Sequence, residues 1–167
     1  AIYFLLTLVE NKGKITNPKP KRFPSVTVII PAYNEEKTIV KTVQSVVNLD
    51  YPIDKLKVIV VDDGSKDNTY LKVEEFIKKL KKRERSYPEV KVVRKENGGK
   101  ASAVNLGIRM ADTEIVATLD ADSFVDRNAL KKMVGYFNNP RVMAVTPSLK
   151  VYKPRTLLQK IQYSEYM

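Results

Sequence analysis

The sequence predicts an α/β domain with a mostly parallel central sheet and helices on both of its faces. Short apolar runs rich in β-branched residues alternate along the chain with longer segments whose apolar residues recur at helical spacing. The runs are strongly apolar, as expected for strands that are covered on both faces. Polar, acidic or glycine-rich residues follow four successive runs, which is where a parallel sheet binds its ligands.

Five strands are expected in order, at residues 26–30, 56–61, 90–93, 114–119 and 142–146. Helices are expected between them, at residues 35–48, 67–85, 100–111 and 130–137, with a last one at 156–167. The fourth helix is expected to stop at Asn138-Asn139-Pro140, because proline cannot continue a helix.

We expect three regions: a membrane-proximal segment and linker at 1–23, the domain at 24–150, and a truncated helical tail at 151–167. Residues 1–9 are strongly apolar but shorter than the roughly 20 residues that cross a bilayer. Basic residues follow closely, as at the cytoplasmic end of a membrane helix, so we interpret the chain as a fragment of a longer protein. An amphipathic or disordered arm is the alternative.

The composition excludes several kinds of chemistry. The 167 residues contain neither cysteine nor histidine, so acid–base or metal chemistry must use carboxylates, lysine or tyrosine. The net charge of +11 would suit nucleic acid, an anionic membrane or phosphate-bearing ligands. No aromatic residues interleave the basic ones, and the densest basic run, at 78–85, ends a predicted helix. We therefore expect no nucleic-acid partner.

Four loops follow the expected strands, at residues 31–35, 62–65, 94–100 and 120–122. Each could be only a turn or a helix cap. In a parallel sheet, however, all four open onto one edge, where ligands bind.

Asp120 and Asp122 lie one residue apart after an apolar run. Carboxylates this close resist joint ionisation unless a cation lies between them. Because oxygen would be the only ligand, Mg²⁺ or Mn²⁺ is expected rather than zinc.

The other loops offer groups for a nucleotide. Asp63 can accept a hydrogen bond from the imide N–H of uracil, and Tyr33 can stack on a base. Gly98 and Gly99 allow the backbone to approach a phosphate, whose charge Lys100 can meet. The first strand lacks a G-x-G-x-x-G motif, and Ala101 stands where a P-loop requires Ser or Thr.

At this point the sequence resembles a family 2 glycosyltransferase with the GT-A fold, which contains a Rossmann-like nucleotide-sugar-binding half. The matching pieces are VIIPAYNE (28–35), VIVVDDGS (58–65), ENGGKASAVNLG (96–107) and LDAD (119–122). The third piece resembles most closely the membrane polysaccharide synthases that make cellulose, chitin and hyaluronan.

The resemblance implies an inverting transferase that uses a nucleotide-diphosphate sugar, usually linked to UDP, and a sugar or lipid acceptor. It assigns roles to eight residues. Pro31, Tyr33 and Glu35 border the nucleoside, Asp63 contacts the base, and Asp62 supports the loop. Lys100 lies near the diphosphate, Asp120 lies near the ribose and donor sugar, and Asp122, with Asp120, binds the metal. It also implies attachment to a membrane through segments outside this chain, with the domain on the cytosolic side.

One departure from the family pattern matters. The acceptor base of such enzymes lies well downstream of the Asp-x-Asp pair, yet Glu165 is the only carboxylate after Asp126. The Gln-x-x-Arg-Trp motif of processive synthases is absent, and the chain has no tryptophan. We therefore expect no catalytic residue within this chain, which would bind UDP with Mn²⁺ or Mg²⁺ but transfer sugar poorly.

Three alternatives stay open. A transferase like dolichyl-phosphate mannose synthases would share the motifs but prefer GDP-mannose. A receiver-like signalling module would explain Asp62-Asp63, although its acidic pair should follow the first strand. A non-catalytic nucleic-acid binder has only the charge in its favour.

Overall fold

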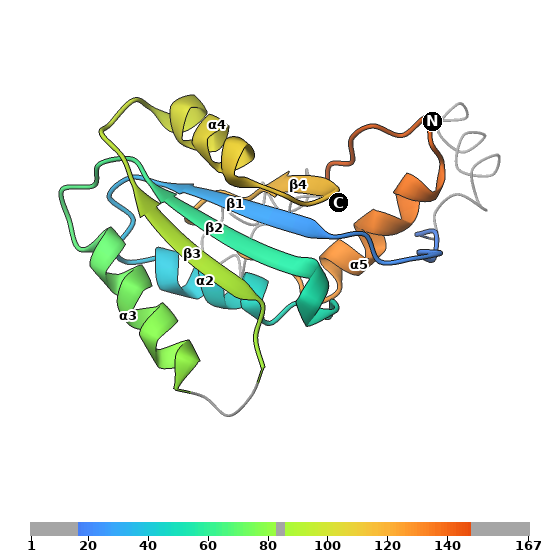
Figure 1. Cartoon of the computed structure of the whole chain (residues 1–167), viewed down its shortest axis with the longest axis horizontal. Coiled ribbons are helices and arrows are strands. Elements are labelled where there is room, and N and C mark those ends of the chain that lie inside the picture. The colour runs from blue at the N-terminus through green and yellow to red at the C-terminus, as the bar shows by residue number, and fades with distance from the viewer. Residues whose placement is uncertain (1–16, 83–85, 148–167) are drawn as a thin grey trace, which may run out of the picture.

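Four parallel strands form one sheet in the part of the chain that the computed structural model describes, residues 17–82 and 86–147 (Figure 1). The strands are β1 (Val26–Ala32), β2 (Leu56–Asp62), β3 (Glu89–Arg94) and β4 (Ile115–Thr118). Their order across the sheet is β3-β2-β1-β4, and every pairing is parallel.

The register brings the carboxyl ends of the strands together. Ala32 at the end of β1 pairs with Asp62 at the end of β2, which in turn pairs with Arg94 at the end of β3. The backbone N–H of Leu119 extends the β4 pairing by donating to the carbonyl of Ile29 at 3.0 Å. The loops that follow the strands therefore leave from one edge of the sheet, as the sequence predicts.

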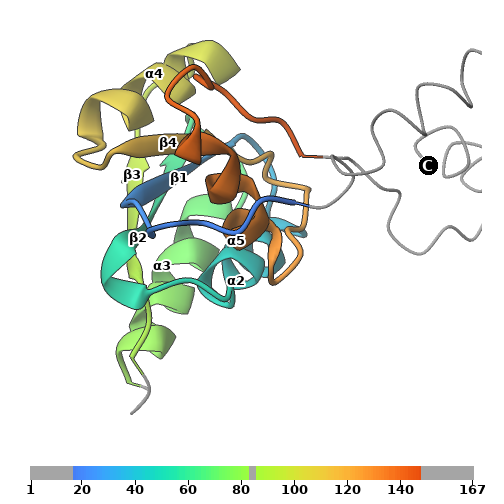
Figure 2. The ribbon, with the colours of Figure 1, turned by 90° about the vertical axis from the view of Figure 1, so that its right-hand side faces the viewer.

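Helices cover both faces of the sheet (Figure 2). The helices are α2 (Ile39–Val47), α3 (Thr69–Lys81), α4 (Lys100–Met110) and α5 (Ala129–Val134), with 3₁₀ turns η2 (Ile53–Lys55) and η3 (Gly135–Asn138). The larger core cluster joins α2, α3 and α5 to one face, and the smaller one joins α4 to the other. The predicted fold class, a mostly parallel sheet between helices, is confirmed.

Strand alternation sorts the side chains between these two cores. Val28 and Ile30 of β1 point to the face covered by α2, whereas Ile29 points to α4. All three are at most 5% exposed, which explains why the strand is apolar at nearly every position.

Helix α4 lies close to β1 because residue 107 is glycine. A Cβ added to Gly107 would lie 2.5 Å from Cγ2 of Ile29, a side chain that is fully buried. The close approach fixes α4, and with it the loop at its N-terminal end, against the sheet.

The N-terminal residues that the structure describes pack onto η3. The backbone N–H of Lys21 donates to Oδ1 of Asn138 at 3.1 Å, and the hydroxyl of Tyr136 donates to Oδ1 of Asn17 at the same distance. Residues 17–21 of the predicted linker therefore contact the domain.

Tyr51 fixes the start of β1. Its buried hydroxyl donates to the carbonyl of Pro24 at 2.6 Å, and its ring meets that of Phe23 edge to face. Burial, with a smaller contribution from Glu114, raises the pKa of Tyr51 to about 12.

The prediction of a fifth strand at 142–146 is wrong. This segment forms no strand pairing, and Met143 is 87% exposed. The backbone N–H of Val142 donates instead to the carbonyl of Asn139, 3.0 Å away, in a turn. An apolar run becomes a strand only where a neighbouring strand can pair with it, and none does so in the described residues.

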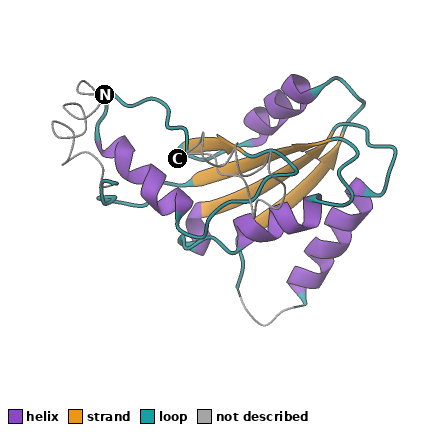
Figure 3. Ribbon diagram, turned by 180° about the vertical axis from the view of Figure 1, so that it is seen from behind, coloured by secondary structure: helices purple, strands orange, loops and turns teal. Residues whose placement is uncertain are grey.

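Two helices are shorter than predicted: the segments 35–38 and 67–68 lie in loops before α2 and α3 (Figure 3). The predicted N-terminal apolar segment and the helical tail at 156–167 lie outside the described residues. Within residues 17–82 and 86–147, no helix combines the length and apolarity that crossing a membrane requires.

Candidate functional site

A cleft of about 270 Å³ lies at the carboxyl ends of the strands. Ten residues line it: Pro31, Ala32, Tyr33, Glu35, Asp63, Lys100, Ala103, Asp120, Ala121 and Asp122. Seven of the eight residues that the sequence singles out are among them. The eighth, Asp62, is not.

Asp62 is fully buried beneath the guanidinium group of Arg94. Its Oδ2 lies 3.1 Å from Nε of Arg94, but neither carboxylate oxygen makes a well-aligned hydrogen bond to a residue that the structure describes. Arg94 also donates to the carbonyl of Ser65 and lies 5.8 Å from the ring centroid of Tyr70 on α3. This geometry suits a residue that holds the end of β2 rather than one that contacts a ligand.

Asp63 is only 3% exposed, yet its carboxylate reaches the cleft. Its Oδ1 accepts from Nζ of Lys95 at 2.6 Å and from the backbone N–H of Gly98 at 3.0 Å, and its Oδ2 accepts from the backbone N–H of Gly99 at 2.7 Å. Burial alone opposes ionisation of Asp63, but these hydrogen bonds outweigh it and hold the pKa of the carboxyl below its ordinary value.

The loop after β1 interlocks with the loop after β2. Asn34 has a left-handed backbone (φ 56°), which asparagine tolerates better than most residues. Its N–H donates to Oγ of Ser65 at 2.9 Å, and its Oδ1 accepts from the N–H of Lys66 at 2.8 Å. The N–H of Glu35 donates to Oγ1 of Thr69, also at 2.8 Å.

This interlocked loop presents Tyr33 and Glu35 at the rim of the cleft. Tyr33 is 43% exposed and lines the cleft, so part of its side chain is available to a ligand. The carboxylate of Glu35 accepts from Oγ1 of Thr38 at 2.6 Å, which fixes its orientation at the start of α2.

Lys100 and Asp120 form an ion pair across the mouth of the cleft. Nζ of Lys100 lies 2.5 Å from Oδ1 of Asp120, and both side chains are more than half exposed. Such a pair contributes little to stability, because solvent screens it. It leaves both groups available to a charged ligand.

Two hydrogen bonds hold the turn that carries Asp120 and Asp122. The N–H of Ser123 donates to the carbonyl of Asp120 at 3.0 Å, which closes the turn. Thr42 of α2 donates from its hydroxyl to the carbonyl of Ala121 at 2.8 Å, in a buried position.

The donor atoms at this end of the cleft fit a hard divalent cation. Asp120 already holds one cation, the ammonium group of Lys100, and Asp122 adds a second carboxylate to the lining. No group of three potential ligand residues gathers within the described ranges, so other ligands would have to come from a bound molecule or water.

The match to a family model covers residues 27–165 and carries the description "Glycosyl transferase family 2". This chain belongs to glycosyl transferase family 2. The resemblance seen in the four motifs is confirmed, and the site described above is the strand-end cleft of a family 2 domain.

Curated relatives in this family are named as polysaccharide synthases. The chain is 37% identical over 169 residues to the poly-β-1,6-N-acetyl-D-glucosamine synthase of Staphylococcus aureus (strain COL), covering 99% of this chain and 39% of the relative. The enzyme of the same name from Staphylococcus epidermidis is 32% identical over 165 residues, covering 98% and 38%. The chain therefore spans about two fifths of these relatives.

Two solved structures that are similar to this chain contain a bound nucleotide sugar. The mannosyltransferase PcManGT from Pyrobaculum calidifontis, in complex with GDP-Man and Mn²⁺, is 34% identical with a TM-score of 0.69, covering 83% of this chain and 41% of that one. Staphylococcus aureus TarS 1-349, in complex with UDP-GlcNAc, is 30% identical with a TM-score of 0.59, covering 68% and 31%.

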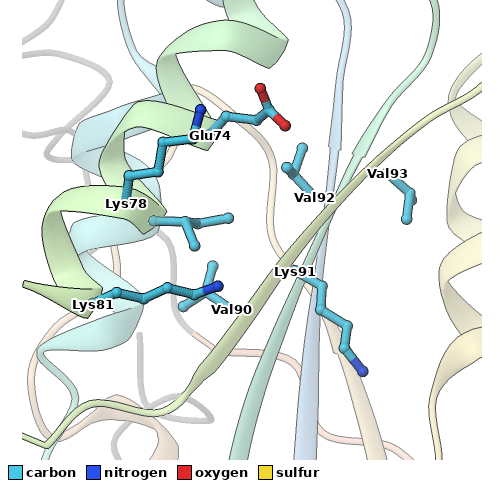
Figure 4. A pocket seen from close by; sticks show the side chains of 8 residues that line it. Glu74, Lys78, Lys81, Val90, Lys91, Val92 and Val93 are labelled. Carbon is cyan, nitrogen blue, oxygen red and sulfur yellow. The ribbon is translucent and has the colours of Figure 1, made fainter.

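A second hollow lies between α3 and β3, and none of the predicted site residues lines it (Figure 4). Its volume, about 290 Å³, is nearly that of the strand-end cleft, so size does not distinguish the two. Val90 and Val92 point toward α3, whereas Lys91 points to the other side of the strand, where it pairs with Glu89 at 2.8 Å. The hollow brings together none of the predicted residues.

The sequence reasoning missed two residues that shape the site of this family 2 domain. Lys95 follows directly on β3, and its place in a strand-end loop was the available signal. For Thr42, the available signal was its position on the buried face of α2, beside Val43 and Val46. A polar side chain buried there needs a hydrogen-bond partner.

Proposed function

We propose that this chain is the donor-binding part of an inverting glycosyltransferase that uses a nucleotide-diphosphate sugar with a divalent metal. The observation that carries the proposal is that seven residues from the four strand-end loops line one cleft. Membership of family 2 and the polysaccharide-synthase names of the relatives support a role in polysaccharide or glycolipid synthesis.

The proposed roles follow from position and chemistry. Tyr33 and Pro31 border the nucleoside beside Glu35, and Asp63 contacts the base from the floor of the cleft. Lys100 meets the diphosphate, for which it leaves Asp120. An ammonium group that exchanges one anion for another loses little charge stabilisation, so this exchange has a small free-energy cost.

Asp122, with Asp120, would hold Mg²⁺ or Mn²⁺. When bound, the metal would act as a Lewis acid that neutralises charge on the leaving nucleotide. The turn at 120–123 and its anchor to Thr42 keep both carboxylates on the side of the cleft where Lys100 lies. Lys100 would meet the charge of the diphosphate there.

UDP is the proposed nucleotide. TarS was solved with UDP-GlcNAc, and the curated relatives named above are poly-β-1,6-N-acetyl-D-glucosamine synthases. GDP-mannose is the second candidate, because PcManGT, the structure with the higher TM-score of the two, was solved with GDP-Man.

Transfer to an acceptor requires a base that deprotonates the acceptor hydroxyl. Glu165 is the only carboxylate after Asp126 in the 167 residues, so we propose that this chain binds the donor and transfers sugar poorly. We also propose that the whole protein acts at the cytosolic side of a membrane, on a sugar or lipid acceptor.

Calorimetric titration of the chain with UDP and with GDP, each with Mn²⁺ and with EDTA, tests the proposal. We expect UDP to bind more tightly than GDP and to lose affinity in EDTA. Asp122→Asn should weaken UDP binding in Mn²⁺ by at least about tenfold and have little effect in EDTA. Asp126→Asn, which changes an exposed carboxylate outside the cleft lining, is the control.

Three results would contradict the proposal. Tighter binding of GDP would favour the mannose donor, and binding of neither nucleotide would overturn the donor site. Robust acceptor glycosylation by this chain would show that the base is present after all.

A further inference from the structure

We propose that Lys95 is a positioning residue that presents the Asp63 carboxylate to the donor base, so that the cleft accepts a base with a ring N–H and rejects one without it. Uracil carries such an N–H at N3, whereas cytosine has an unprotonated nitrogen there. This inference rests on the proposed function and adds to it the means by which the base is chosen.

The three hydrogen bonds to Asp63 leave one acceptor position toward the cleft. Oδ1 accepts both from Nζ of Lys95 and from the N–H of Gly98, which fills its two lone pairs. Oδ2 accepts only from the N–H of Gly99 in the described residues, so it retains a lone pair. Asp63 lines the cleft, so a base bound there can use this remaining position.

Lys95 is held in place by its own surroundings. Its backbone N–H donates to the carbonyl of Asp62 at 3.0 Å, which fixes it beside the end of β2. Its side chain is only 20% exposed, and Nζ also donates to the carbonyl of Glu96. The ammonium group therefore stays on Oδ1.

Glycine at position 64 permits this close approach of the two loops. Gly64 has φ +73°, and an added Cβ would lie 2.9 Å from the backbone nitrogen of Asn97 and 3.2 Å from the carbonyl oxygen of Lys95. The chain is thus shaped to bring the loop at 95–99 onto the end of β2.

The charge of Lys95 determines which base fits. Asp63 is almost fully buried, and a buried carboxylate with no cation nearby tends to take up a proton. An ionised Asp63 is only an acceptor and matches the N–H of uracil, but a protonated one carries an O–H that matches N3 of cytosine. Lys95 adds its charge to the N–H groups of Gly98 and Gly99 in keeping Asp63 ionised, so the position is an acceptor only.

The two basic residues at the end of β3 do not share this task. Arg94 pairs with Asp62 on the α3 side of the sheet, and Lys95 pairs with Asp63 on the α4 side. Among the described residues, Lys95 is the only cation paired with Asp63, because Arg94 pairs with Asp62 and Lys100 pairs with Asp120.

The test is calorimetric titration of the chain with UDP and with CDP in the presence of Mn²⁺. The two nucleotides share ribose, diphosphate and metal, so the ratio of their affinities reports on the base alone. We expect the chain to prefer UDP by at least about tenfold, since a missing partner leaves a buried polar group unpaired.

Lys95→Met should reduce this preference to about twofold or less, with a loss of UDP affinity and a gain in CDP affinity. Lys95→Arg, which keeps the cation, should retain the preference. Lys91→Met is the matched control, because Lys91 is an exposed lysine on β3, four residues before Lys95, and pairs with Glu89. Thermal unfolding of each variant establishes that it is folded, and Lys95→Gln replaces Lys95→Met if that variant does not fold.

Equal weakening of UDP and CDP would overturn the inference, because it would show a general structural role. An unchanged ratio in Lys95→Met would overturn it as well. Both outcomes leave the proposed function standing, which fails separately if the unmodified chain binds neither UDP nor GDP.

Discussion

Two adjacent aspartates at the end of β2 have opposite surroundings. Because side chains alternate across a strand, Asp62 points to the α3 side, where Arg94 covers it above the ring of Tyr70. Asp63 points to the α4 side, where it accepts hydrogen bonds from the glycines before α4. One carboxylate therefore stabilises the loop, and its neighbour lines the cleft.

The surroundings of Asp63 make an acid-dependent contribution to stability. Its pKa is lowered in the folded protein, since the hydrogen bonds from Lys95, Gly98 and Gly99 outweigh the effect of burial. The unfolded chain, with an ordinary aspartate pKa of about 3.9, binds a proton more readily. The stabilisation is thus fully present above that value and is lost as the pH falls through the lower, folded pKa.

We expect Asp63→Asn to lower the melting temperature at pH 7 and to reduce the fall in melting temperature between pH 7 and pH 3. Differential scanning calorimetry across this range measures both effects. Asp54→Asn, at an exposed aspartate on η2, is the control and should change neither. A pH response in Asp63→Asn as steep as that of the unmodified chain would contradict the expectation.

At the scale of elements, α2 supports the site although it contributes no side chain to the cleft lining. Its Thr42 hydroxyl holds the carbonyl of Ala121, in the middle of the turn that carries Asp120 and Asp122. The bond is buried, so its loss would leave an unsatisfied carbonyl. The position of the acidic turn thus depends on the packing of a helix from much earlier in the chain.

Thr42→Val tests this dependence, because valine has nearly the same shape but no hydroxyl. We expect a loss of about 1–3 kcal/mol in the free energy of unfolding, and weaker binding of UDP with Mn²⁺. Urea denaturation and calorimetric titration measure the two effects.

Thr113→Val is the matched control. The hydroxyl of Thr113 donates to that of Thr27 at 2.7 Å, at the end of the sheet opposite the cleft. This variant should lose stability and keep its affinity for UDP with Mn²⁺. If both variants bound UDP equally well, α2 would not position the acidic turn.

The elements also show where sequence reasoning succeeds. The four strands that formed are rich in apolar residues and lie next to another strand, so an apolar run was a sufficient signal. The run at 142–146 has the same composition but no partner strand in the described residues, and composition does not reveal pairing. Helix α2 begins later than predicted because the backbone N–H groups of Glu35 and Glu36 donate to Thr69 and Asp67 at the start of α3. No local pattern shows this long-range contact.

At the scale of the whole molecule, parallel topology made most of the site predictable. Once the strands are known to run in one direction, their exit loops must share an edge, and seven of the eight predicted residues line the cleft there. Lys95 could not be distinguished in the same way, because it is one of 30 basic residues, most of which suit a solvated surface. Only the pairing of β2 with β3 brings it to Asp63.

The place of β4 in the sheet has a consequence for the order of folding. β4 pairs with β1, the first strand of the sheet, although β2, α3, β3 and α4 all lie between them in the chain. Closing so long a loop is slow compared with pairing nearby segments. The acidic turn directly follows β4, so we expect Mn²⁺ affinity to appear only in the slowest refolding phase of a stopped-flow experiment, after most of the helical signal has recovered. Metal binding within the dead time of the experiment would contradict this order. In the expected order, the chain forms a collapsed core first and gains the ability to bind a cation last.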